Sequence, residues 1–105
     1  MNWRASPETD EDLIAAREFI AADNETAARD FLDAAFEAFD RLAQFPEMGP
    51  RVRFKHRALK GVRFFVLPPP FNRWLIFYQP AGDGVDIKRV LYGNVNWRQE
   101  PERFF

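Results

Sequence analysis

Four side chains in the second half of this chain have the types that phosphodiester cleavage by a neighbouring 2'-hydroxyl would need. Arg63, Arg73 and Arg89 lie in or beside apolar runs, and Tyr92 ends the last of these runs. The arginines could neutralise the charge of a phosphorane, and the tyrosine could protonate the leaving oxygen. These four residues are the candidate catalytic set if the protein is a nuclease.

A general base for that chemistry is harder to find. His56 is the single histidine, and its sequence neighbours offer nothing to position it. We therefore interpret it as a solvated side chain. The chain has no cysteine, which excludes thiolate metal sites and disulfides, and one histidine leaves little for a zinc site. We expect no metal and no cofactor.

Three short runs rich in β-branched and aromatic residues, at 62–67, 73–79 and 85–92, predict three strands. The first connection contains three prolines, and the second, at 80–84, supplies glycines for a hairpin turn. Both connections are short, so the strands should form an antiparallel meander. The middle run is apolar on both parities, which predicts that each face of the sheet is covered.

The last predicted strand contains an arginine at an apolar parity. Arg89 shares its parity with Ile87 and Leu91, so either it points into an apolar face or a bulge at 88–90 shifts the register. In the functional interpretation, Arg89 and Arg63 line a concave face that binds a target.

Two helices should precede the sheet. Ser6 and Pro7 read as an N-cap and first helical residue, and Asn24 reads as the N-cap of a second helix that runs from Glu25 to about Gln44. Apolar residues recur at helical spacing in both segments: Leu13, Ile14, Ala16 and Ile20, then Ala28, Phe31, Leu32, Ala35, Phe39 and Leu42. With almost no linker between them, the helices should form an antiparallel hairpin that covers one face of the sheet.

Charge is distributed unevenly along the chain. Residues 1–50 carry 4 Lys and Arg against 12 Asp and Glu, whereas residues 51–105 carry 11 against 4. No acid lies between Arg51 and Arg63, a pattern expected to attract a polyanion or an acidic peptide. We expect a protein partner here, and direct binding to nucleic acid is not expected.

Length and composition indicate one domain, residues 1–105, without a bilayer-spanning run or an apolar signal segment. We expect a cytoplasmic protein that does not bind membranes. The tail after Gly93 could form a short helix or lie across the second face of the sheet. If it leaves that face open, Trp74 or Phe77 would remain as an exposed apolar patch that needs a partner.

The order of these motifs resembles the ParE branch of the ParE/RelE toxin superfamily. The likeness includes the short N-terminal strand, Ser6-Pro7, the break at Asn24, residues 45–49 with the basic loop after them, and residues 87–93. The resemblance implies an α+β fold, in which an N-terminal short strand precedes an antiparallel two-helix hairpin packed on a three- to four-stranded mainly antiparallel sheet. The short strand should lie parallel beside the last strand.

By this resemblance, the chain is a toxin of a type II toxin-antitoxin module, of the plasmid stabilisation kind, which poisons DNA gyrase and is neutralised in a hetero-oligomer by a ParD-like antitoxin. RelE-like messenger RNA cleavage on the ribosome and an inactive antitoxin-binding relative remain alternatives. RelE-like nucleases tend to carry a catalytic tyrosine or histidine in the C-terminal segment, where this chain has Trp97, Phe104 and Phe105. ParE relatives often have histidine where this chain has Tyr92.

The resemblance also suggests two binding surfaces. The target would contact Arg89, Tyr92, Asn94 and Trp97. The antitoxin would add a strand to the edge at 62–67 and place its acids on the basic segment. The residues expected to contact the antitoxin are Arg51, Arg53, Arg57, Val62, Phe64, Trp74 and Phe77.

Overall fold

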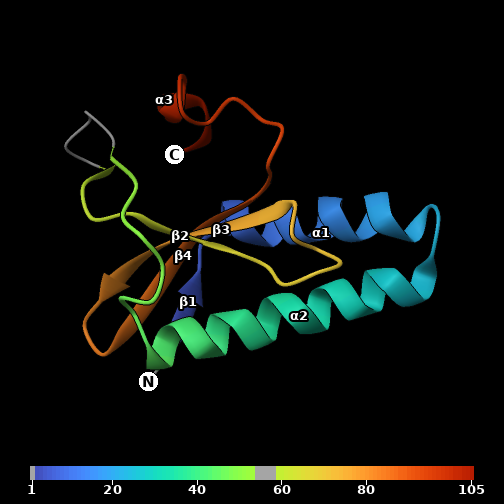
Figure 1. The fold of residues 1–105 in the computed structure, drawn as a ribbon, viewed down its shortest axis with the longest axis horizontal. Helices are drawn as coiled ribbons and strands as arrows, with labels where there is room; N and C mark the ends of the chain where they lie inside the picture. Colours follow the sequence, from blue (N-terminus) through green and yellow to red (C-terminus); the bar gives the residue numbers. More distant parts are fainter. Residues whose placement is uncertain (1, 54–58) are drawn as a thin grey trace.

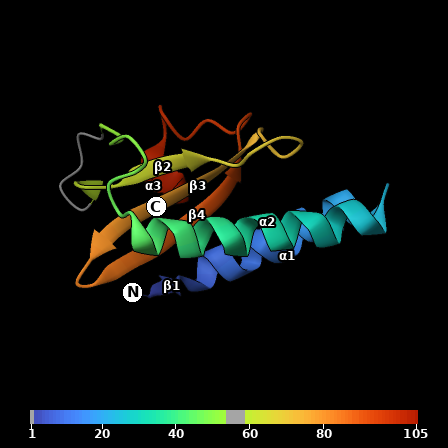
Figure 2. The ribbon, with the colours of Figure 1, turned by 60° about the horizontal axis from the view of Figure 1, so that its bottom comes forward.

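A computed structural model describes residues 2–53 and 59–105 of the protein. In chain order the elements are β1 (Trp3–Ala5), α1 (Pro7–Ala21), α2 (Glu25–Gln44), β2 (Arg63–Val66), β3 (Trp74–Ala81), β4 (Gly84–Tyr92) and α3 (Pro101–Phe104). The helices α1 and α2 lie on one side of the sheet, and the C-terminal segment with α3 lies on the other (Figures 1 and 2). The predicted α+β fold is therefore confirmed.

The sheet has the strand order β1-β4-β3-β2. Strands β2, β3 and β4 form the predicted antiparallel meander, and β1 pairs in parallel with β4 through Trp3 and Val85. The second connection is shorter than predicted, because β3 continues through Pro80 and Ala81. Proline is tolerated there because β2 begins at Arg63, opposite Tyr78, so the Pro80 nitrogen faces no neighbouring strand.

Side-chain caps begin both long helices, as predicted. The Ser6 hydroxyl accepts a hydrogen bond from the Thr9 amide at 3.0 Å, and the Asn24 side chain accepts one from the Ala27 amide at 3.0 Å. Ser6 also donates to the carbonyl of Lys88 at 2.9 Å, which fixes the start of α1 against β4.

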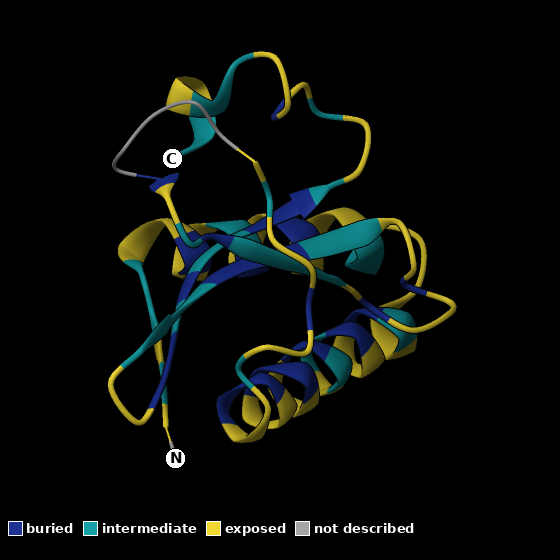
Figure 3. Ribbon diagram, turned by 60° about the vertical axis from the view of Figure 1, so that its left-hand side comes forward, coloured by how far each residue is buried: buried dark blue, intermediate teal, exposed yellow. Residues whose placement is uncertain are grey.

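The main core lies between the helix hairpin and the sheet. Phe31, Phe39 and Leu42 of α2 are fully buried against Ile76 and Tyr78 of β3. Helix α2 carries buried and exposed residues on different sides along its length (Figure 3). The predicted stripe of α1 is wrong at one position, because the Ile14 side chain is 59% exposed while Leu13 and Ala16 are buried.

A second apolar cluster covers the other face of the sheet. It joins Val62, Phe77 and Leu91 of the sheet region to Trp97 of the tail, with Phe104 and Phe105 packed against it. The Phe77 ring lies 4.8 Å from that of Trp97 and 5.1 Å from that of Phe105, measured between centroids. The tail thus forms a short helix and also covers the second face.

Candidate functional site

The structure does not bring the four candidate catalytic residues together. Arg63 pairs with Tyr78, which faces the helices, and Arg89 pairs with Phe77, which faces the tail. Residues directly opposite in an antiparallel pair share a face. Arg63 and Arg89 therefore lie on opposite faces of the sheet, and the expectation that they line one concave face is wrong.

A bulge in β4 places Arg89. Phe77 pairs with Arg89 and Tyr78 pairs with Ile87, so Lys88 is the extra residue, and of the two alternatives for Arg89 the structure has the bulge. Arg89 Nε and Nη2 donate to the two carboxylate oxygens of Asp12 at 2.7 and 2.8 Å. These hydrogen bonds raise the pKa of Arg89 above its ordinary value.

The same two residues connect three parts of the chain. Asp12 Oδ2 also accepts a hydrogen bond from the Val90 amide at 3.0 Å, and Arg89 Nη1 donates to the Phe104 carbonyl at 2.6 Å. Since β1 ends opposite Ile87, the Val90 amide lies on an edge of β4 that β1 does not cover. Asp12 and Arg89 thus join α1, β4 and the tail.

Arg63 is also held within the chain. Its Nη1 donates to the carbonyls of Gly49 at 2.7 Å and Glu47 at 3.2 Å. The Gly49 amide in turn donates to the buried Tyr78 hydroxyl at 2.8 Å. A Cβ at Gly49 would collide with the Phe64 carbonyl, so the connection after α2 can approach β2 this closely because residue 49 is glycine.

The residues predicted to contact a target differ in accessibility. Tyr92 is half-buried, and the centroid of its ring lies 4.9 Å from that of the Trp74 ring and 6.5 Å from that of the Phe19 ring. Trp97 is buried under the tail, and Asn94 is exposed. Arg73, the remaining catalytic candidate, is exposed beside Trp74, and its carbonyl accepts from the Gly93 amide at 2.7 Å.

The residues predicted to contact an antitoxin also separate into two groups. Val62 and Phe77 are buried by the tail, so as the chain is folded they offer no surface, and the expectation of direct docking on them is wrong. Phe64 and Trp74 are half-buried, and Arg51 and Arg53 are exposed. Arg57 lies outside the described residues, as does His56.

The predicted free edge of β2 is partly covered by the chain itself. The Val52 amide donates to the Val62 carbonyl at 2.8 Å, and the Phe64 amide donates to the Pro50 carbonyl at 3.1 Å. Beyond this pairing, Val66 is 41% exposed, and its backbone amide and carbonyl point away from β3. A groove of about 190 Å³ runs between this part of β2 and α2, lined by Ala34, Glu37, Ala38, Arg41, Phe65, Val66 and Pro68.

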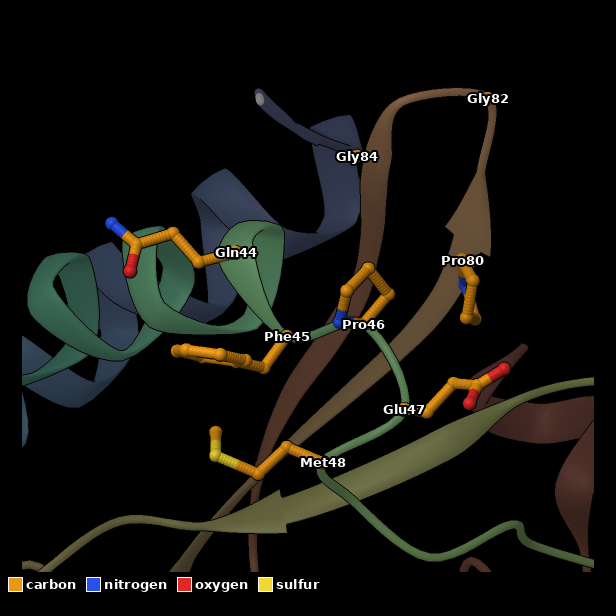
Figure 4. Close-up of a pocket in the computed structure, with 8 residues that line it drawn as sticks. All are labelled: Gln44, Phe45, Pro46, Glu47, Met48, Pro80, Gly82 and Gly84. Carbon is orange, nitrogen blue, oxygen red and sulfur yellow. The ribbon is translucent and has the colours of Figure 1, made fainter.

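An open cleft of about 710 Å³ lies where α2 ends, and nothing in the sequence pattern indicated it. Phe45 and Met48 extend to the same side of the connection after α2, and Pro80 of β3 lines the cleft with them (Figure 4). The Phe45 side chain is 59% exposed and that of Met48 39%. Proline and glycine dominate the sequence signal at residues 45–50, and they indicate the end of a helix rather than a cleft.

Within residues 2–53 and 59–105, no group of three or more His, Cys, Asp or Glu side chains is placed to hold a metal ion. No helix there has the length and apolarity needed to cross a bilayer.

The arrangement of a two-helix hairpin on a mixed sheet of this strand order also occurs in a solved structure. One solved structure, described as the chromosomal ParDE TA system from P. aeruginosa, matches with a TM-score of 0.68 and 17% identity, covering 88% of this chain and 95% of the other. No curated protein matches. The family described as "ParE toxin of type II toxin-antitoxin system, parDE" matches residues 4–97. The chain belongs to this ParE toxin family of type II toxin-antitoxin systems.

Proposed function

We propose that residues 1–105 form one toxin domain that stops growth by binding DNA gyrase in the cytoplasm, and that a ParD-like antitoxin neutralises it. The family match over residues 4–97 carries this proposal. The positions of the candidate catalytic arginines support binding over RNA cleavage. Arg63 donates to backbone carbonyls on one face of the sheet, and Arg89 lies on the other face, where it pairs with Asp12. The two arginines therefore cannot both stabilise one phosphorane in this arrangement.

The first test is to induce the chain without an antitoxin in a bacterial host and to follow DNA and protein synthesis by pulse-labelling over the first minutes. An early halt in DNA synthesis with translation intact is expected. Purified gyrase should then lose supercoiling activity or accumulate cleaved DNA when the protein is added. An early halt in translation would contradict the proposal in favour of RNA cleavage, and growth without any change would favour an inactive binder.

The antitoxin contact follows from the part of β2 that the chain leaves unpaired. We propose that an extended segment of the antitoxin pairs with the outward-facing backbone groups of Val66 and fills the groove against α2. Arg51 and Arg53 would contact acids of the same partner further along the edge. Removing the antitoxin segment that docks here should abolish neutralisation.

A substitution in the groove tests this contact from the toxin side. Val66→Glu should weaken antitoxin binding by about tenfold or more, because the antitoxin strand paired with Val66 would cover and desolvate the new carboxylate. Ile14→Glu is the matched control, because Ile14 is also an exposed aliphatic residue but belongs to α1. Equal affinities of the two variants, measured by titration calorimetry, would show that the antitoxin docks elsewhere.

A further inference from the structure

Three arginines from two distant segments surround one cavity on the tail side of the sheet. Arg51 and Arg53 come from the segment that pairs with β2, and Arg98 comes from the tail. The cavity has a volume of about 390 Å³, and its remaining lining is Val52, Phe64 and Trp97. The fold therefore brings an arginine of the C-terminal region next to two arginines of the basic segment.

Within the described part of the chain, no acidic side chain forms an ion pair with these guanidinium groups. Among the described residues, ion pairs join Arg4 to Asp86, Arg17 to Glu25, Arg89 to Asp12 and Arg103 to Glu100, and none includes a member of the cavity. No acid lines the cavity, and the sequence from 54 to 58 contains no acid either. The three positive charges are therefore available to a ligand.

The walls of the cavity are aromatic. Trp97 lies under the tail with its ring centroid 6.3 Å from that of Phe64, and the Arg98 guanidinium carbon lies 4.7 Å from the Trp97 ring centroid. Stacking on an aromatic ring restricts the planar guanidinium and reduces the entropy lost when it binds an anion. A guanidinium held in this way suits a ligand with several oxygens in a fixed geometry.

We propose that Arg51, Arg53 and Arg98 form a binding site for the phosphodiester backbone of a nucleic acid. A single carboxylate would leave much of this charge unneutralised, whereas successive phosphates supply one negative charge per nucleotide. The acidic helices cover the opposite face of the sheet, so a polyanion would approach from the tail side. This goes beyond the gyrase-binding proposal and departs from our expectation that the cations serve a protein partner alone.

The test uses the full chain and labelled oligonucleotides of about 12 nucleotides, within the usual site size for single strands. Fluorescence anisotropy at low salt should detect binding, and Arg51→Ala, Arg53→Ala and Arg98→Ala should each weaken it at least about threefold and lower the salt slope by about 0.7. Arg29→Ala, which removes the same charge from the exposed side of α2, should change neither. Parallel titrations with single-stranded RNA, single-stranded DNA and duplex DNA identify the source of the backbone.

Several results would overturn the site. Absence of binding to all three nucleic acids would do so, and so would an Arg29→Ala effect equal to that of Arg98→Ala, which would mean that net charge alone matters. A glutamate-rich peptide of equal charge that binds more tightly than the oligonucleotides would reassign the cavity to an acidic protein. Circular dichroism of each variant verifies that the fold is unchanged.

Discussion

The Tyr78 side chain is fully buried, and its hydroxyl accepts a hydrogen bond from the Gly49 amide. Burial raises the pKa of Tyr78 above its ordinary value of 10.0, because the phenolate would lose its solvation. A group whose pKa is raised by folding contributes stability that is fully present below the unfolded pKa and is lost as pH rises toward the folded one. Tyr78 therefore makes the free energy of unfolding decrease above about pH 10.

The chain has two tyrosines, so this titration can be isolated. In a Tyr92→Phe variant, the near-ultraviolet absorbance of tyrosinate reports Tyr78 alone and should have its midpoint above 10.0. Tyr78→Phe is the converse control and should remove that shifted signal. A midpoint at or below the ordinary value would mean that solvent reaches the hydroxyl.

The Asp12–Arg89 pair should contribute strongly to stability. The side chains of Asp12 and Arg89 are 13% and 19% exposed, so Asp12→Ala would remove the carboxylate acceptor of a largely buried arginine side chain and of the Val90 amide. We expect a loss of about 2 to 4 kcal/mol in the free energy of unfolding, measured by urea denaturation.

Asp86→Ala is the control for the Asp12 variant, because it breaks another Asp–Arg pair in which the Arg4 side chain is 74% exposed. An exposed pair of this kind contributes about 1 kcal/mol or less. Similar losses for the two variants would contradict a structural role for the Asp12 pair.

For Arg89, the bulge was predictable from the sequence, but the acid that pairs with it was not. Its parity in an apolar strand indicated the bulge, which is a local property. The acid that it pairs with lies 77 positions away, and several other acids surround Asp12 in the sequence. Nothing local distinguishes Asp12 from them, so the pairing depends on how α1 packs across β4.

At the scale of elements, the tail acts as the cover of the second sheet face. Deleting residues 101–105 removes Phe104, Phe105 and the carbonyl that accepts from Arg89. We expect a loss of about 2 to 4 kcal/mol, from two partly buried phenylalanines, and increased binding of a dye that reports exposed apolar surface.

Phe19→Ala provides the comparison for this deletion, because the Phe19 side chain is 69% exposed and its removal should change stability little. If the truncated chain binds no more dye than the full chain, the tail does not protect Phe77 in solution.

Most elements were predictable because their signals are local. The caps Ser6 and Asn24, the helix hairpin and the antiparallel meander follow from residue type and spacing, and the structure has them. The extent of β3 and the pairing of residues 50–52 with β2 were not predictable, because both depend on where a neighbouring strand begins. The arginine cavity was not predictable either, because Arg98 joins it through the packing of the tail.

At the scale of the molecule, the acidic helices and the basic second half separate charge across the sheet. We expect the association rate with an acidic antitoxin to fall at least about tenfold between low and 1 M salt, because long-range attraction is screened. Dissociation should change little, since it depends on short-range contacts. Stopped-flow mixing measures both rates, and an association rate that does not depend on salt would contradict electrostatic steering by the basic half.

The parallel pairing of β1 with β4 links the two ends of the sequence, since Arg4 and Asp86 are separated by 82 positions. During synthesis, the first strand leaves the ribosome long before its partner exists, so the sheet cannot close until β4 has emerged. Contacts of such long range form late in folding. The newly made toxin therefore passes through an interval in which it has been synthesised but is not yet folded, and a folded surface for its partners exists only after the sheet has closed.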